Sequence, residues 1–339
     1  MRIGIDVMGG DNAPDAILHG SVAALAEIEP GDALVLFGDE RLITDHLEKS
    51  EVDCSQIEVV GTSQIIGMDD PPVEAVRSQP DSSLVRLAES AGRRAENPLD
   101  AVLSAGNTGA FVAAAQMHMR RLKHVTRPGI AAVLPTFGGA LTVIDVGANI
   151  EPKPMHLAQY GLMGGLYARS MLGIDNPRVA LLNVGGEEQK GTKDVQAARE
   201  LLLQVSELNF IGSVEGRGLF EGEADVVITD GVVGNVVLKL TEGLSTSIMK
   251  QMAAEMGGLS QELNAEFQAV VRKLYAKYDY HEYGGAPLLG VNGVCLICHG
   301  SSQARTITNA VRAARRLVAQ NINVAISEYL SQSEEEVVA

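Results

Sequence analysis

Short, largely apolar runs that end in polar loops containing glycine are the feature that most limits the fold of this sequence. Residues 2–7, 101–103 and 178–184 are such runs, and several of the loops that follow them lead into helical patterns. Continuous apolar runs of this kind are typical of strands buried on both faces of a sheet. The sequence therefore predicts an α/β protein with a three-layer αβα architecture, in which a mostly parallel sheet lies between two layers of helices.

The apolar patterns also place the individual elements. The predicted strands are 2–7, 33–37, 57–60, 101–103, 131–134, 141–146, 178–184, 210–212, 226–229 and 294–298. The predicted helices are 14–28, 41–49, 83–96, 109–122, 154–171, 195–208, 235–256, 260–275 and 302–321. Gly138-Gly139 separates two predicted strands and indicates a hairpin, so we expect the sheet to be mixed.

The domain organisation has no marker in the composition. Residues 1–330 contain no internal repeat and no low-complexity linker, so we interpret them as one large catalytic unit, with two subdomains as the alternative and no boundary assigned. Residues 331–339 are acidic and are predicted to fray.

The charge and the aromatic content exclude some classes of partner. The formal net charge is −16, tryptophan is absent and aromatic residues make up only 4%, which argues against nucleic acid as a partner. An acidic protein partner would need a local basic cluster on this surface. The sequence offers two, and an ordinary solvated helix end is the alternative for either: Arg120, Arg121, Lys123 and Arg127, and Arg312, Arg315 and Arg316.

The start of the chain and its cysteines suggest a location. Met1 is followed at once by a predicted strand rather than by a signal-peptide pattern, and the long uncharged stretches are interrupted by polar residues, proline or glycine. Three cysteines without a signal peptide suggest a reducing compartment. We expect a cytoplasmic protein.

The 36 glycines gather in loops at the ends of predicted strands. These loops are 6–11, 104–110, 145–149, 183–187, 229–235 and 299–302. In open α/β sheets the carboxyl edge of the strands is where ligands bind, and backbone N–H groups at a helix start attract anions. A single loop of this kind usually makes only a tight turn, but the recurring set with Asp, Asn, Ser or His favours a shared site for phosphate or a similar anion.

Other ligand motifs are incomplete. Gly186–Lys193 resembles a nucleotide P-loop with its lysine and threonine in the wrong order, and no dinucleotide fingerprint occurs. Cys295 and Cys298 with His299 match the spacing of haem attachment, but the stretch lies in a predicted apolar strand, and buried structural cysteines are the favoured interpretation. We therefore expect no cofactor and no metal.

Taken together, the loops resemble the PlsX family of phosphate acyltransferases in bacterial fatty acid and phospholipid synthesis. The motifs occur in order over residues 1 to about 325: DVMGGD (6–11), SAGNTGA (104–110), DVGAN (145–149) with Lys153-Pro154, LLNVG (181–185) with Glu187, TDG…GN…LK (229–239), YGG…LLG (283–290) and HGSS (299–302). Each motif alone is weak, whereas the ordered set is specific. One departure is the segment 77–81, where relatives often carry more lysine.

The resemblance implies a reaction and its partners. An acyl group would pass from acyl-(acyl carrier protein) to inorganic phosphate, and a membrane glycerol-3-phosphate acyltransferase would use the acyl phosphate. The fold would resemble those of phosphotransacetylase and of isocitrate and isopropylmalate dehydrogenases, in a homodimer without metal or nucleotide. The alternatives are a phosphotransacetylase-like enzyme that uses acyl-coenzyme A, a dehydrogenase of this fold, and a non-catalytic protein that binds the acyl carrier.

The candidate site residues come from the glycine loops and their flanks. Gly106, Asn107, Thr108 and Gly109 are candidates to cradle phosphate, and Lys153 and Lys190 to neutralise it. Candidates to stabilise the oxyanion or to orient the acyl group are Asn149, His156, Asn235 and His299, with Asp145 and Asp230 holding these donors. A solvated or structural role is the alternative for each lone histidine or lysine; Lys153 is favoured because it follows DVGAN as in the family.

A further apolar stripe lies within residues 259–278. Leu259, Leu263, Phe267, Val270, Val271, Leu274 and Tyr278 recur at helical spacing, with basic residues along the later half. This pattern suits peripheral contact with the inner face of the membrane, with a dimer contact or core packing as the alternative.

Overall fold

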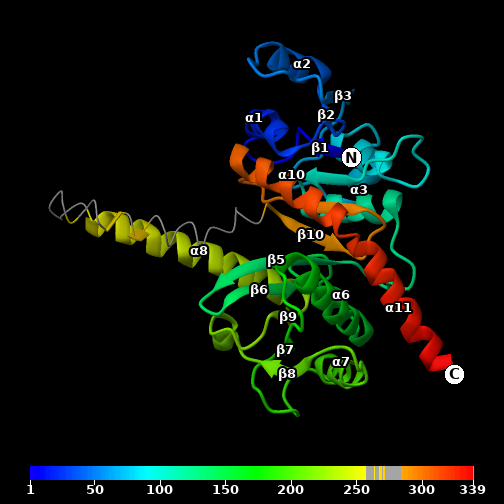
Figure 1. Ribbon diagram of the computed structural model, residues 1–339, viewed down its shortest axis with the longest axis vertical. Coiled ribbons are helices and arrows are strands. Elements are labelled where there is room, and N and C mark those ends of the chain that lie inside the picture. Colours follow the sequence, from blue (N-terminus) through cyan, green and yellow to red (C-terminus); the bar gives the residue numbers. More distant parts are fainter. Residues whose placement is uncertain (257–262, 264–266, 269, 272–283, 339) are drawn as a thin grey trace. The chain divides into compact units, whose positions relative to one another are not determined.

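The computed structural model describes residues 1–256, 263, 267–268, 270–271 and 284–338 (Figure 1). The chain divides into two compact units. The first comprises Met1–Ile130, Arg169–Ile174 and Tyr283–Ala339, and the second comprises Ala131–Ala168 and Asp175–Glu282.

The first unit is a largely parallel sheet flanked by helices. Its strands follow the order β3 (Ile57–Gly61), β2 (Ala33–Gly38), β1 (Arg2–Asp6), β4 (Ala101–Ser104), β11 (Val294–Ile297) and β10 (Ala286–Leu289). β1, β2, β3, β4 and β11 are parallel, whereas β10 pairs antiparallel with β11. The parallel strands therefore end at one edge of the sheet.

The helices of the first unit pack on this sheet. They are α1 (Asp15–Ala23), α2 (Glu40–Glu48), α3 (Pro72–Ser78), α4 (Ser83–Ser90), α5 (Thr108–Ala114), α10 (Ala304–Ala319) and α11 (Ile322–Val338), with a 3₁₀ turn at Ala24–Glu27 and a π-helical turn at Ala115–Met119. α10 packs against α1, β4 and β11, and α4 packs against β1 and β2. Gly20 of α1 allows the close approach, because a Cβ there would lie 2.6 Å from the carbonyl oxygen of Ala304.

The strand order continues in the second unit with β5 (Gly129–Thr136), β6 (Gly139–Ile144), β9 (Val226–Ile228), β7 (Val179–Leu182) and β8 (Phe210–Val214). β5 begins in the first unit, where residues 129 and 130 pair with β10, and continues into the second. β5 and β6 form the predicted hairpin, and β6, β9, β7 and β8 are parallel. The prediction of a mixed sheet is confirmed.

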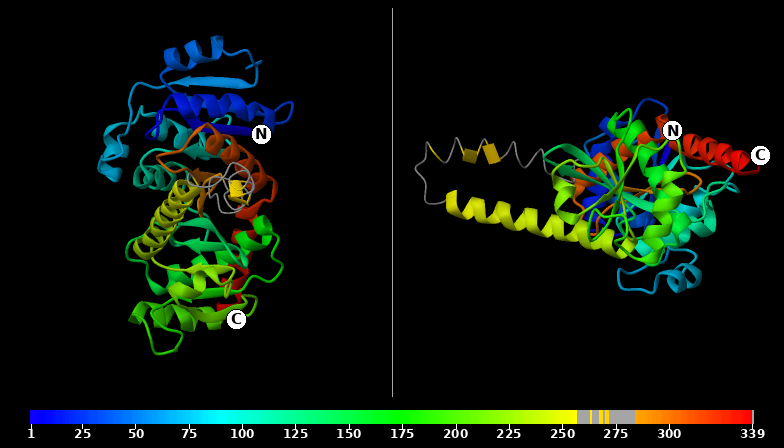
Figure 2. Two further views of the ribbon diagram at one scale, coloured as in Figure 1. Left: turned by 90° about the vertical axis from the view of Figure 1, so that its left-hand side faces the viewer. Right: turned by 90° about the horizontal axis from the view of Figure 1, so that it is seen from below.

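The helices of the second unit are α6 (Pro154–Leu172), whose last residues belong to the first unit, α7 (Lys193–Leu203) and α8 (Gly231–Met256), with a 3₁₀ turn at Gly216–Phe220. Gly161 and Gly164 bring α6 close to β9, because a Cβ at either position would lie 2.7–2.8 Å from side chains of that strand. Figure 2 shows that α8 extends well past the strands of its own unit. In the described residues, no helix combines the length and the apolarity that a membrane span requires.

The predicted fold class is confirmed, with differences in single elements. β10, α3 and α11 are additional to the prediction, and α11 ends at Val338. The fraying predicted for 331–339 stays a prediction. The predicted helix at 260–275 lies outside the described residues, apart from 263, 267–268 and 270–271.

Candidate functional site

In the first unit, three of the predicted loops meet at the carboxyl ends of β1, β4 and β11. The buried carboxylate of Asp6 accepts a hydrogen bond from Ser104 Oγ at 2.7 Å, and Ser104 Oγ accepts one from the N–H of Gly106 at 3.0 Å. Burial raises the pKa of Asp6 above the ordinary aspartate value, although Ser104 and the N–H of Met8 donate to it. Asp6 thus holds the start of the 104–110 loop in place.

Glycine is required where the loops touch. A Cβ on Gly9 would lie 2.4 Å from Asp6 Oδ2 and 2.7 Å from the N atom of Gly106. Gly10 has a φ of +113°, a conformation that glycine adopts without strain. Any larger residue at Gly9 would force the first two loops apart.

Asn107 fixes the start of α5. Its Oδ1 accepts from the N–H of Ala110 at 3.0 Å, as a helix N-cap does. Its Nδ2 donates to the carbonyl oxygens of Gly67, Met68 and Asp70 at 3.0–3.1 Å. The side chain therefore ties the 67–70 loop to the helix, while Thr108 and Gly109 follow it half-buried in the first helical turn.

The third loop, residues 299–302, is bound to the other two. The N–H of Asp11 donates to the carbonyl oxygen of Gly300 at 2.8 Å, and Asn12 Nδ2 donates to that of Ser301 at 3.1 Å. His299 Nδ1 accepts from the N–H of Ser301 at 3.1 Å, so this nitrogen carries no proton. The hydroxyl of Ser301, 2.7 Å from the same nitrogen, is then the donor to it.

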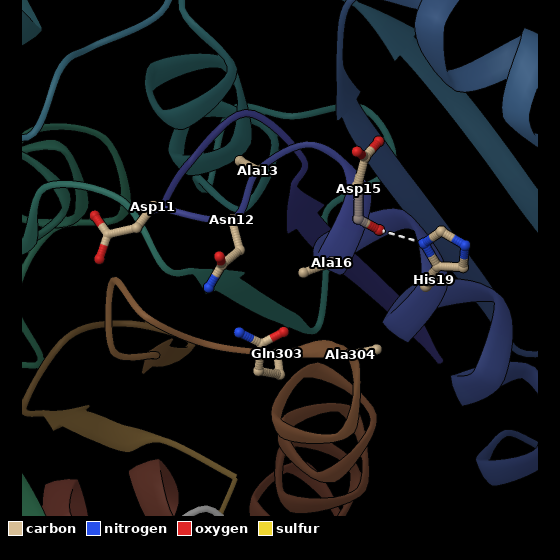
Figure 3. A pocket seen from close by; sticks show the side chains of 8 residues that line it. All are labelled: Asp11, Asn12, Ala13, Asp15, Ala16, His19, Gln303 and Ala304. Carbon is tan, nitrogen blue, oxygen red and sulfur yellow. Dashed lines mark hydrogen bonds between the residues drawn. The ribbon is translucent and has the colours of Figure 1, made fainter.

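A pocket of about 510 Å³ opens beside these loops, between the starts of α1 and α10 (Figure 3). Its lining residues are Asp11, Asn12, Ala13, Asp15, Ala16, His19, Gln303 and Ala304. The two helix starts would attract an anion, but the carboxylates of Asp11 and Asp15 would repel it. We therefore do not assign phosphate to this pocket.

In the second unit, Asp145 organises the loop after β6. Its side chain is buried and accepts hydrogen bonds from the N–H groups of Gly147, Ala148 and Asn149 at 2.7–3.1 Å. Asn149 Nδ2 lies 3.3 Å from the same carboxylate. Asp145 thus has the geometry expected of a residue that positions Asn149.

The start of α8 packs directly against this loop. Asp230 Oδ1 accepts from the N–H groups of Val232 and Val233 at 2.8–2.9 Å, and the N–H of Gly231 donates to the carbonyl oxygen of Asn149 at 2.8 Å. A Cβ on Gly234 would lie 1.9 Å from the carbonyl oxygen of Asp145. Asp145, Asn149, Asp230 and the exposed Asn235 are therefore brought together.

Lys153 and His156 stand at the start of α6, a few residues after this loop. His156 Nδ1 accepts from the N–H of Lys153 at 3.1 Å and so caps the helix. The side chain of Lys153 is exposed and forms no ion pair with any residue that the structure describes. Its charge is thus available for an anion.

Lys190 lies in the loop after β7, at the same edge of the second sheet. Its Nζ is 3.8 Å from Glu187 Oε1, and its side chain is about half exposed. Within the described part of the chain, no hydrogen bond or ion pair joins it to the Asp145 loop or to α8. Of the cations predicted for this unit, Lys153 is the one that follows the Asp145 loop directly.

The cysteines are buried thiols. Cys295 and Cys298 are free of disulfides, and burial raises the pKa of Cys298 to about 12 and that of Cys295 further. Within the described residues, no group of three His, Cys, Asp or Glu side chains is arranged to hold a metal ion.

A family model described as "Fatty acid synthesis protein" matches residues 1–325. Curated relatives align over almost the full length. The phosphate acyltransferase of Heliobacterium modesticaldum is 44% identical over 336 residues, covering 97% of this chain and 98% of the relative. That of Desulforamulus reducens is 42% identical over 331 residues, covering 97% of each.

The chain belongs to this fatty acid synthesis protein family. The resemblance to the PlsX family is thereby confirmed, and the protein is an enzyme of the acyltransferase class in lipid synthesis.

Solved structures with the same fold include phosphotransacetylases. One from Streptococcus pyogenes has a TM-score of 0.61 at 15% identity, with 94% of each chain covered. The EutD phosphotransacetylase of Staphylococcus aureus has a TM-score of 0.59 at 17% identity, covering 93% of this chain and 94% of that one. At these identities the likeness shows the fold alone, and it confirms the predicted phosphotransacetylase-like architecture.

Some residues that shape these loops were not among the site candidates proposed from the sequence. Asp6, Asn12, Ser104 and Gly234 each make a contact that holds a loop or permits a close approach. The sequence signal for Asp6 was an aspartate at the end of an apolar strand, directly before paired glycines. The candidates themselves divide between the units: Gly106–Gly109 and His299 lie in the first, and the others lie in the second.

Proposed function

We propose that this enzyme transfers the acyl group of acyl-(acyl carrier protein) to inorganic phosphate, releasing acyl phosphate and free carrier protein. The observation that carries the proposal is the match, over nearly the whole chain, to relatives named phosphate acyltransferases at 42–44% identity. The glycine loops support it, because they offer helix starts to an anion, and because Lys153, which follows one of them, forms no ion pair with a described residue.

The reaction needs no nucleophile from the protein. A phosphate oxygen attacks the thioester carbonyl, so that a C–O bond forms and the C–S bond breaks. The electron pair of the C–S bond leaves with the carrier sulfur, and the proton of hydrogen phosphate passes to that thiolate. The protein has to hold the two reactants together and to stabilise the oxyanion, and one good oxyanion donor contributes about 3–4 kcal/mol.

The candidates for these tasks are proposed unit by unit. In the second unit the proposed phosphate contact is Lys153, and in the first unit it is the first turn of α5, at Thr108 and Gly109. Gly106 shapes the loop rather than binding phosphate in this proposal, since its N–H already donates to Ser104. Asn107 positions the start of α5. Asn149, Asn235, His156 and His299 are the proposed donors, Asp145 and Asp230 are positioning residues, and Lys190 is a second phosphate contact.

A homodimer is part of the proposal. On α8, the side chains of Val236, Leu240, Leu244 and Ile248 recur every four residues, and each is at least half exposed. Such a continuous apolar face supports burial against a second copy of the chain.

Delivery of the product to a membrane glycerol-3-phosphate acyltransferase is also part of the proposal. Leu263, Phe267 and Val270 of the 259–278 stripe are exposed, which suits peripheral contact with a membrane surface. Leu259, Leu274 and Tyr278 of the same stripe lie outside the described residues.

The test is acyl phosphate formation by purified enzyme from long-chain acyl carrier protein and phosphate, with acyl-coenzyme A in parallel. We expect a product that depends on both the carrier and phosphate. Turnover of acyl-coenzyme A without turnover of the carrier thioester would instead assign the enzyme to phosphotransacetylase-like chemistry. Tight binding of the carrier without turnover of either thioester would favour a non-catalytic protein that binds the acyl carrier.

A further inference from the structure

One of the two long stretches of this acidic chain without an acidic residue runs through the first unit into β5 and β6. Residues 101–144 contain no Asp or Glu, but they carry Arg120, Arg121, Lys123 and Arg127. All four of these side chains are exposed, and none forms an ion pair with a described residue. In a protein of net charge −16, this is a local excess of uncompensated positive charge.

Two more unpaired cations adjoin this stretch. Arg93 and Arg94 are exposed and likewise form no ion pair with a described residue. Gly92 packs against the segment, because a Cβ there would lie 2.9 Å from the carbonyl oxygen of His118. We call these six residues the basic patch: Arg93, Arg94, Arg120, Arg121, Lys123 and Arg127.

The basic patch stands on a firmly held backbone. The carbonyl oxygen of Arg120 accepts from the N–H of Asn292 at 2.9 Å, and the N–H of Leu122 donates to the carbonyl oxygen of Gly290 at 3.0 Å. Leu122 and Val125 are buried and anchor the segment. Arg120 has a φ of +71°, a conformation that costs a non-glycine residue roughly 1–3 kcal/mol and that the surrounding contacts must maintain.

In the other basic cluster, two of the three arginines are paired with carboxylates. Arg312 forms two hydrogen bonds to Glu27, at 2.7 and 2.8 Å, and lowers the pKa of that carboxyl group. Arg315 pairs with Glu29 at 2.8 Å and with Asp32 at 3.3 Å. Arg316 donates to the carbonyl oxygen of Met171 at 3.0 Å. Only Arg316 of this cluster therefore keeps a charge that no described carboxylate compensates, against six such residues in the basic patch.

We infer that the basic patch is the docking surface for the acidic acyl carrier protein, an inference that rests on the proposed function. Charge complementarity favours this occupant. A membrane surface is less suitable, because none of the large apolar side chains of residues 91–127 is exposed.

The position of the patch agrees with its role. α5 and the π-helical turn run without a break from the 104–110 loop to Arg120. At 1.5 Å per residue, their combined length is about 18 Å. A carrier docked at the end of this helix would stand one helix length from the loop proposed to hold phosphate, within reach of a thioester on a flexible arm.

The test is the Michaelis constant for acyl carrier protein in Lys123→Glu/Arg127→Glu and, separately, in Arg93→Glu/Arg94→Glu. Each double variant should raise this constant by about tenfold or more at low salt and leave the constant for phosphate within about twofold. The wild-type constant should rise between about 20 and about 200 mM salt, and the variants should lose most of that dependence. Arg41→Glu/Lys49→Glu, within α2 and directly after it, reverses the same number of charges elsewhere and should change neither constant.

Unchanged carrier constants in both folded variants would overturn the inference. A second outcome would also overturn it: if the variants lost binding to anionic lipid vesicles but kept the wild-type Michaelis constant for the carrier, the patch would be a membrane-binding surface. Surface plasmon resonance with the carrier separates this inference from the proposed function. Loss of binding in the variants supports the docking surface even if the enzyme turns over only acyl-coenzyme A, and absence of binding to the wild type overturns it.

Discussion

At the scale of single residues, hydrogen bonds separate the residues that position the loops from those available to a substrate. Asp145 and Asn107 are occupied by backbone groups, each with at least three hydrogen bonds. Lys153, in contrast, is exposed and unpaired among the described residues. It is therefore the side chain on which the proposed phosphate contact depends most.

We predict that Lys153→Ala lowers kcat/KM for phosphate by about tenfold to a hundredfold, since a hydrogen bond to a charged group contributes about 1.5–3 kcal/mol. The unfolding temperature should stay close to that of the wild type, because the side chain is exposed. Lys193→Ala, at the exposed start of α7, is the matched control and should keep normal kinetics. A Lys153→Ala enzyme with an unchanged dependence on phosphate would remove this residue from the site.

The buried thiols lead to a prediction for alkaline pH. In the unfolded chain a cysteine ionises near its ordinary pKa of 9.0, whereas burial raises the pKa of Cys298 to about 12 and that of Cys295 further. Above pH 9 the unfolded state therefore loses protons that the folded state keeps, and the free energy of unfolding falls as the pH rises.

Between pH 8.5 and 10, we expect each thiol to remove about 1 kcal/mol of stability. Urea unfolding of the wild type and of Cys295→Ala/Cys298→Ala at both pH values measures this. The variant should lose less stability than the wild type over that interval. Equal losses would mean that the thiols ionise as easily in the folded protein as in the unfolded chain.

The positions of the candidate loops could be predicted from the sequence, because strand ends and paired glycines mark them. The roles of individual residues within the loops could not be predicted. The N–H of Gly106 donates to Ser104, two residues away, and Asn107 binds carbonyl groups of a loop up to 40 residues away in the sequence. Such contacts appear only once the chain is folded. Pairing of charges was equally hidden, since the two basic clusters look alike until Glu27, Glu29 and Asp32 are found beside one of them.

At the scale of elements, α8 is the helix whose start shapes the candidate site of the second unit. Its first turn is capped by Asp230, and its close approach to the loop after β6 is possible only because residue 234 is glycine. Later in the same helix, Gly243 has nothing within 4 Å of the place where a Cβ would stand. The two glycines therefore form a matched pair.

We predict that Gly234→Ala destabilises the protein by at least about 1–3 kcal/mol, because the added methyl group collides with the backbone of Asp145. Its activity should fall as well, since the loop that carries Asn149 must move. Gly243→Ala should instead stabilise by up to about 1 kcal/mol through helix propensity. Chemical denaturation and turnover of the two variants test this, and an equal response would show that the close contact is unimportant.

The elements that the sequence did not predict have local reasons. β10 contains Pro287 and is only four residues long, so its pattern resembles a loop more than a strand. α3 starts at a pair of prolines and is short. α11 follows α10 after Asn321, whose φ of +51° ends one helix and lets the next begin without a polar linker.

At the scale of the whole molecule, the chain passes between its two units more than once. Short pieces such as Arg169–Ile174 return to the first unit from the middle of the second. A change of composition along the sequence cannot mark such a boundary, which is why none was assigned. The parallel strands and their loops were predictable because they are encoded locally in each βα segment.

The exposed face of α8 predicts the state of assembly. We expect a homodimer in solution, and Leu244→Lys should produce monomers because it places a charge within that apolar face. Thr246→Lys, at an exposed position away from the stripe, should remain dimeric. Light scattering coupled to size-exclusion chromatography measures the masses. A dimeric Leu244→Lys variant would place the interface elsewhere.

The most direct measurement follows the oxygen atoms of phosphate that is labelled throughout with ¹⁸O. If the enzyme transfers an acyl group to phosphate, mass spectrometry should find all the oxygens of the phosphoryl group labelled in the acyl phosphate, including the one that bridges to carbon. If one of them were unlabelled, the bridging oxygen would have come from a carboxylate. The enzyme would then transfer a phosphoryl group, and acyl transfer to phosphate would be wrong.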